Sequence, residues 1–197
     1  MSGSILDVLS QQLGGDVVKQ LSAQLGADEG SVNTAITAAL PMLLGGLAKN
    51  SATPQGAEAL SSALARDHDG GILDNLTGFL GSGNAGAGPN ILGHVFGGKT
   101  DTVASALGQA SGLNAGSAGS LLAMLAPVVM GALGRTQQQS GLDSGGLANM
   151  LGNERAQLEQ SSSGLGGLMR MLDFDGDGQV MDNIGEIAGA LGSLFRR

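Results

Sequence analysis

The feature that most constrains the fold is a pair of long apolar segments, 86 residues apart, that align without a gap. Pro41 falls on Pro127 inside these segments, and Lys49 falls on Arg135 near their ends. The aligned stretches, residues 5–50 and 91–136, share ten identical residues in 46 positions. An unbroken register over that length predicts an internal duplication. Coincidence within an Ala/Gly/Leu-rich chain is the alternative.

Helical periodicity and helix-end residues recur in both halves. Ser4 and Asp28 precede apolar runs as N-cap residues, and Gly26 ends one of these runs. The expected helices cover residues 5–13, 17–25, 29–50 and 54–64, and then 91–97, 101–111, 115–135 and 143–151. Alternating runs typical of strands are nearly absent. The expected fold class is all-α: a multihelical duplicated bundle, with about three to four helices per repeat and a C-terminal helix–loop–helix.

These elements divide the chain into four expected regions. Residues 1–80 form the first repeat and residues 91–160 the second. Between them, the sequence GSGNAGAGP makes residues 81–90 a glycine-rich linker. Residues 161–197 form the C-terminal acidic-loop helix–loop–helix. Pro41 and Pro127 lie inside the long helices, where a proline removes a backbone hydrogen bond and is expected to bend the helix.

The core must be aliphatic because the chain has no Trp, Tyr or Cys and only 4 Phe. With 36 glycines available, helices are expected to approach one another closely through Ala and Gly faces. The two most apolar stretches, residues 36–48 and 121–134, are shorter than the roughly 20 residues that span a bilayer. We therefore expect buried core helices and no transmembrane segment. An interfacial or re-entrant segment, in contact with a membrane surface, is the alternative.

Charge and the N-terminal sequence bear on partners and compartment. A net charge of −8 with nine scattered Lys and Arg residues argues against nucleic-acid binding. The sequence MSGSILDVLSQQLGGD lacks the basic and apolar regions of a signal peptide. A cytoplasmic protein is the expectation, and secretion without a cleavable signal is the alternative.

The strongest chemical signal is an acidic loop near the C-terminus. Asp173, Asp175 and Asp177 occupy positions 1, 3 and 5 of an EF-hand-like calcium loop, and Gly178 occupies position 6. Gln179 offers its backbone carbonyl at position 7. Position 12 holds Ile184 in place of the bidentate Glu, so Asp182 is expected to supply the last carboxylate. The predicted metal ligands are Asp173, Asp175, Asp177, Gln179 and Asp182, with Ca²⁺ as the ion.

A polar turn without metal is the alternative for this loop. Asp182 also fits the N-cap of an outgoing helix, and the other aspartates fit solvated turn positions. Residues 67–76 echo the loop with His68 but lack the Asp at its fifth position, so a polar turn before a helix is favoured over a second metal site. His94, within an apolar helix, is expected to be a structural or surface residue.

No catalytic constellation is present in the sequence. There are only two histidines and no G-x-S-x-G motif, and the glycine-rich stretches do not follow a strand. Aromatic residues that would line a sugar-binding cleft are missing. The protein is therefore expected not to be an enzyme, and an enzyme with an unrecognised site is the least favoured class.

The motifs together resemble the YidB-like family of bacterial proteins, a domain of unknown function. The resemblance rests on ALPMLLGGLAKN, LAPVVMGALGRT, NILGHVFGG and the terminal MLDFDGDGQVMDNI, whose acidic part is similar to short loops of the excalibur type. It implies a multihelical, duplicated fold without an assigned enzyme activity. The expected function is calcium binding combined with protein–protein contacts or self-association, and a secreted or surface-associated calcium-dependent structural protein is the alternative.

Overall fold

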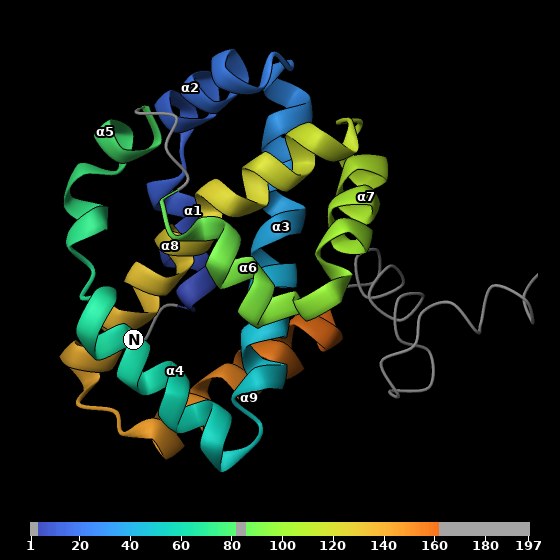
Figure 1. Ribbon diagram of the computed structural model, residues 1–197. Helices are drawn as coiled ribbons and strands as arrows, with labels where there is room; N and C mark the ends of the chain where they lie inside the picture. Colours follow the sequence, from blue (N-terminus) through green and yellow to red (C-terminus); the bar gives the residue numbers. More distant parts are fainter. Residues whose placement is uncertain (1–3, 82–85, 162–197) are drawn as a thin grey trace, which may run out of the picture. The chain divides into compact units, whose positions relative to one another are not determined.

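The computed structural model describes residues 4–81 and 86–161, and within these residues every regular element is helical (Figure 1). The all-α fold class is confirmed. The elements are α1 (Ile5–Gln12), α2 (Gly15–Leu25), α3 (Glu29–Asn50), α4 (Pro54–Asp67), η1 (Gly71–Asn75), α5 (Leu76–Gly81), α6 (Gly88–Phe96), η2 (Gly97–Lys99), α7 (Thr100–Ser111), α8 (Ala115–Ser140) and α9 (Ser144–Ser161).

The chain divides into two compact units, Met1–Arg155 and Ala156–Arg197. Within the first unit, α3 and α8 run through the middle, with α2 and α7 beside their first turns and α4 towards their other ends (Figure 1). The second unit contributes only the last turns of α9 to the described residues. The predicted helix–loop–helix at 161–197 lies almost entirely outside them.

Local signals in the sequence set most helix ends. The Asp28 carboxylate accepts a hydrogen bond from the Ser31 backbone N–H at 2.9 Å, and α3 begins at the next residue. Thr53 caps α4, in which Pro54 is the first residue. Gly26 follows α2 with φ of 61°, a left-handed conformation that a side chain disfavours. These ends agree with the prediction.

Several boundaries differ from the prediction: α2 begins two residues earlier, at Gly15, and α4 ends three residues later, at Asp67. Helix α6 begins at Gly88, inside the expected linker, because Pro89 is favourable in a first helical turn. Helix α8 continues to Ser140, five residues beyond Arg135, and ends at the left-handed Gly141. Helix α9 extends to Ser161 rather than ending at Leu151. The division into four regions stays a prediction.

The core is aliphatic, as expected from the composition. Its largest fully buried side chains in the described residues are all leucines: Leu9, Leu21, Leu40, Leu43, Leu44, Leu64, Leu80, Leu107, Leu121, Leu122, Leu125 and Leu133. Helices α3 and α8 supply seven of them. Both helices are long and apolar enough to cross a membrane by length and composition, yet 72% and 78% of their apolar windows are buried inside the protein. Such burial is typical of core helices.

Glycines allow helices to approach at backbone distance. A Cβ built on Gly88 of α6 would lie 1.8 Å from the Ala123 carbonyl oxygen of α8. One built on Gly134 of α8 would lie 1.8 Å from the carbonyl oxygen of His68, after α4. No side chain fits at either position without separating the two backbones. The expected close approach through glycine faces is therefore present.

The short helix of each half contacts the first turn of the long helix of the other half. The Ser117 hydroxyl, in the first turn of α8, donates to the Leu25 carbonyl at the end of α2, at 3.4 Å. Gly112, after α7, lies against the Ser31 hydroxyl in the first turn of α3. The two serines are 86 residues apart, the spacing of the sequence match, and Leu25 and Gly112 are 87 residues apart. The duplication itself stays a prediction.

Candidate functional site

The five predicted metal ligands, Asp173, Asp175, Asp177, Gln179 and Asp182, lie outside the described residues. Their arrangement therefore stays a prediction from sequence. Within residues 4–81 and 86–161, no group of three or more His, Cys, Asp or Glu side chains is placed to hold a metal ion.

The turn that echoes the acidic loop uses its carboxylates in separate local contacts. Asp69 accepts a hydrogen bond from the Gly71 backbone N–H at 2.9 Å, which shapes the turn. Asp74 pairs with Arg135 of α8 at 2.5 Å, and the same guanidinium donates to the Gly70 carbonyl at 2.8 Å. Because the carboxylates have different partners, the geometry agrees with a polar turn that leads into helices η1 and α5.

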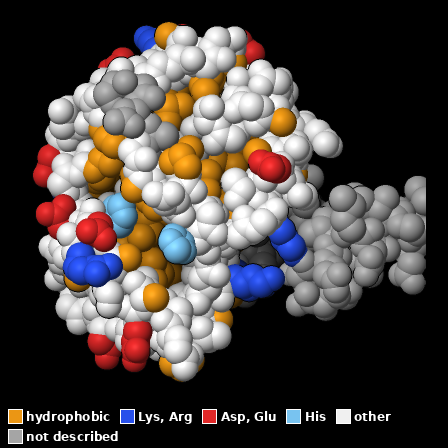
Figure 2. All heavy atoms as spheres, in the orientation of Figure 1, with side chains coloured by type: hydrophobic (Ala, Val, Ile, Leu, Met, Phe, Trp, Pro, Cys, Tyr) orange, Lys and Arg blue, Asp and Glu red, His pale blue; other side chains and the backbone are white. Residues whose placement is uncertain are grey.

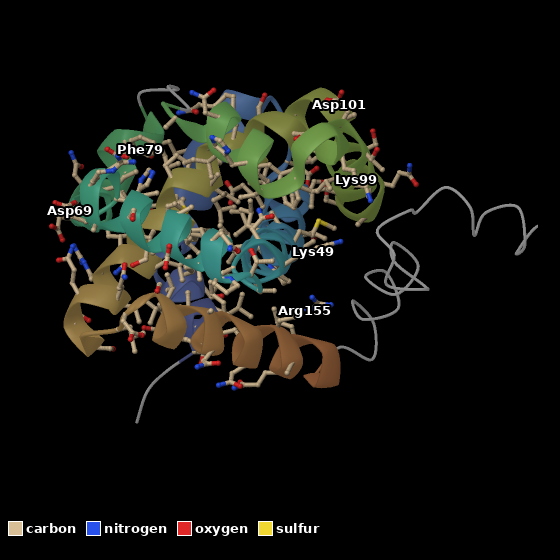
Figure 3. All side chains as sticks on the ribbon, turned by 60° about the horizontal axis from the view of Figure 1, so that its bottom comes forward. Lys49, Asp69, Phe79, Lys99, Asp101 and Arg155 are labelled. Carbon is tan, nitrogen blue, oxygen red and sulfur yellow. The ribbon has the colours of Figure 1, made fainter. Side chains whose placement is uncertain are left out.

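His68 is the titratable side chain in this turn with a perturbed environment. It lies half-buried beside a cavity of about 200 Å³, which is also lined by Asp67, Asp69, Gly70, Ile72, Phe79, Ala87 and Pro127. Figure 3 shows Asp69 and Phe79 on the same side of the molecule. Burial lowers the pKa of the His68 imidazole below its ordinary value, and the neighbouring Asp67 carboxylate opposes the shift.

His94 is a surface residue, one of the two expected alternatives. Its side chain is exposed on α6, and its backbone carbonyl accepts a hydrogen bond from the Asn50 side-chain amide at 2.9 Å. The same amide donates to the Val95 carbonyl at 3.2 Å. This pair of bonds fastens the end of α3 to the end of α6 and satisfies carbonyls that a helix end leaves free.

A second concave surface is an open groove of about 700 Å³ between α2, α6, α7 and α8. Its lining carries no charged side chain: Gln24, Leu25, Pro89, Leu92, Thr100, Gly116, Gly119, Ser120, Ala123 and Met124. In the space-filling view, apolar side chains lie mainly in the middle of the face and charged ones mainly near its edge (Figure 2). The groove is suited to uncharged groups, and no sequence signal marks it.

Sequence reasoning also missed a buried carboxylate. Glu154 of α9 is only 9% exposed, and its two oxygens accept hydrogen bonds from the Ser4 hydroxyl at 2.7 Å and the Ile5 backbone N–H at 3.2 Å. It thereby pairs donors at the start of α1, where the first backbone N–H groups have no partner within the helix. The interaction is structural, and it joins residues 150 positions apart.

Comparison with known proteins supports one assignment. A family model described as "Bacterial protein of unknown function (DUF937)" matches residues 7–136, which include α8 as far as Thr136 and end before the acidic loop. No curated protein and no solved structure matches the chain. The match spans well over half of the 197 residues, and the chain therefore belongs to the DUF937 family of bacterial proteins of unknown function.

Proposed function

We propose that the protein is a non-enzymatic helical module that binds Ca²⁺ through its C-terminal loop and acts through protein–protein contacts. The observation that supports it is the sequence DFDGDGQVMD, which places four carboxylates within ten residues. Carboxylate and carbonyl oxygens are the ligands that Ca²⁺ prefers, and the glycine at position 6 permits the required turn. Without a cation, these carboxylates repel one another at neutral pH.

The closing ligand decides whether the loop is a calcium site. Because Ile184 replaces the usual bidentate Glu, Asp182 has to provide the last oxygens. We expect Asp182→Ala to weaken Ca²⁺ binding about as much as Asp173→Ala. Asp101→Ala serves as a matched control, because Asp101 is an exposed carboxylate on α7, far from the loop in sequence.

Isothermal titration calorimetry of the full chain with CaCl₂, and with MgCl₂ for comparison, tests the proposal. The expected result is binding of one Ca²⁺ ion by the wild type and the Asp101→Ala variant, with strongly weakened binding by the two loop variants. No heat and no change in melting temperature at millimolar Ca²⁺ would refute calcium binding. Equal affinities of all four proteins would place the ion elsewhere in the chain.

Protein contacts are the second part of the proposal. Among the large apolar side chains of the described residues, Val8 is the one that is exposed, at 46%. The described surface therefore gives little support for a broad apolar dimer face. Contact with a partner protein and self-association both remain part of the proposal. Sedimentation velocity of the full chain with and without Ca²⁺ separates them, since a Ca²⁺-dependent dimer would support self-association.

We further propose a cytoplasmic location. The secreted or surface-associated alternative draws on the acidic, cysteine-free composition. Cell fractionation separates the two, because recovery of the protein from cell-free culture supernatant would support the alternative and contradict a cytoplasmic protein.

A further inference from the structure

We propose that His68 makes the junction between α4 and η1 sensitive to acid, so that protonation of its imidazole loosens η1 from α8. The junction is the stretch from His68 to Asn75, which connects the end of α4 to α5. The proposal does not depend on calcium binding, because all the residues that carry it lie in the described part of the first unit.

The junction is held against α8 by close backbone contacts. The His68 carbonyl lies against Gly134, and the Ile72 side chain lies against Gly131, where an added Cβ would be 2.5 Å from Ile72 Cγ2. Gly70, with φ of 93°, turns the chain beside Arg135. Because the backbones of the junction and α8 are in direct contact, neither can shift without changing the packing. A displacement of His68 is therefore expected to disturb these contacts together.

The cavity that His68 helps to line combines apolar walls with a polar rim. Ile72, Phe79, Ala87 and Pro127 provide apolar surface, which a charged imidazolium avoids. The Asp67 carboxylate favours the protonated ring and so opposes the effect of burial. The charged groups around His68 also have contacts of their own. On α4, Asp67 lies 3.9 Å from Arg66; in the turn, Asp69 binds the Gly71 N–H; between η1 and α8, Asp74 pairs with Arg135.

The sign of the effect follows from the pKa of His68. Since burial lowers it, the closed junction favours the neutral imidazole, and the open junction has the higher proton affinity. Acidification through the ordinary pKa of about 6.5 therefore shifts the equilibrium towards the open form. Each unit of difference between the two pKa values favours opening tenfold once the pH is below both.

Hydrogen exchange of the full chain tests the proposal, with wild type and His68→Gln compared at the same pH. Amides of residues 71–76 should exchange several-fold faster in the wild type than in His68→Gln at pH 5.5, and at equal rates at pH 7.5. His94→Gln is the matched control, because the chain has only these two histidines, and it should retain the acid-induced acceleration. His68→Asn replaces His68→Gln if the latter does not fold.

A second measurement removes the remaining ambiguity. Titration of the His68 ring by NMR should give a pKa below 6.5. A value at or above 6.5 would overturn the proposal. So would a low value with unchanged exchange of residues 71–76, since protonation of the ring would then leave η1 in place.

Discussion

Replacement of Gly134 by alanine tests whether the two backbones at the α4–α8 crossing are in contact. The new Cβ would lie 1.8 Å from the His68 carbonyl oxygen and 2.9 Å from its carbon. Ordinary C···O contacts are about 3.3–3.6 Å, so the two segments would have to separate by about 1.5 Å. Overpacking of this kind costs about 3 kcal/mol at the upper end of the usual range.

The same substitution has an opposing effect on the helix itself. Alanine is more favourable than glycine in a helix interior by about 1 kcal/mol. The expected net loss is therefore about 2 kcal/mol, which lowers the melting temperature by roughly 4–8 °C in a chain of this size. The assay is thermal unfolding followed by far-ultraviolet circular dichroism, with chemical denaturation as a check on the free energy of unfolding.

Gly119→Ala on the same helix is the control. Its Cβ would lie 3.6 Å from the Ala104 Cβ, an ordinary van der Waals distance. Here the helix gain is unopposed, so the melting temperature should rise by about 1–4 °C. If Gly134→Ala is as stable as the wild type, or both variants lose the same stability, the backbone contact at His68 is wrong.

Three further predictions concern stability. Glu154→Ala leaves the buried Ile5 N–H without its acceptor and should lower the free energy of unfolding, measured by urea denaturation, by about 1–3 kcal/mol. Glu154→Gln should lose less stability. Equal stability of the wild type and both variants would exclude the contact. Leu121→Ala empties a fully buried site in α8 and should cost about 2–5 kcal/mol in the same assay, whereas a loss below 1 kcal/mol would contradict its burial. Because the pKa of His68 is lowered by folding, its stabilising effect is complete above about pH 6.5 and is lost as the pH falls; the wild type should therefore lose more melting temperature than His68→Gln between pH 7.5 and 5.5.

Many features of the fold depend on short-range patterns in the sequence. A capping side chain such as Asp28 or Thr53 acts within three residues of its position, so helix ends can be predicted without knowing the tertiary structure. The sequence pattern places the start of α6 three residues too late, because the glycines before Pro89 are typical of a linker. In the structure Gly88 is helical and packs on Ala123, a contact that no local pattern reveals.

The candidate sites depended on longer-range information. Glu154 gains its role from Ser4 and Ile5, about 150 residues away in sequence. The cavity beside His68 combines residues of η1, α5 and α8 that share no motif. Conversely, the acidic loop is a local pattern, so its ligands and its ion can be proposed from the sequence alone, and both stay predictions. Its closure by Asp182 is the step that requires measurement.

The reciprocal crossing of the two halves has a consequence during synthesis. Helix α3 ends at Asn50, and α8, the other long apolar helix of the core, ends at Ser140, so about 90 residues must be added before the core can close. At about 5–20 residues per second, this takes roughly 5 to 18 s. Throughout that interval the nascent chain exposes a helix whose residues 38–48 include no polar side chain. The N-terminal half is therefore expected to need a chaperone, or shelter at the ribosome, until its second long helix has emerged.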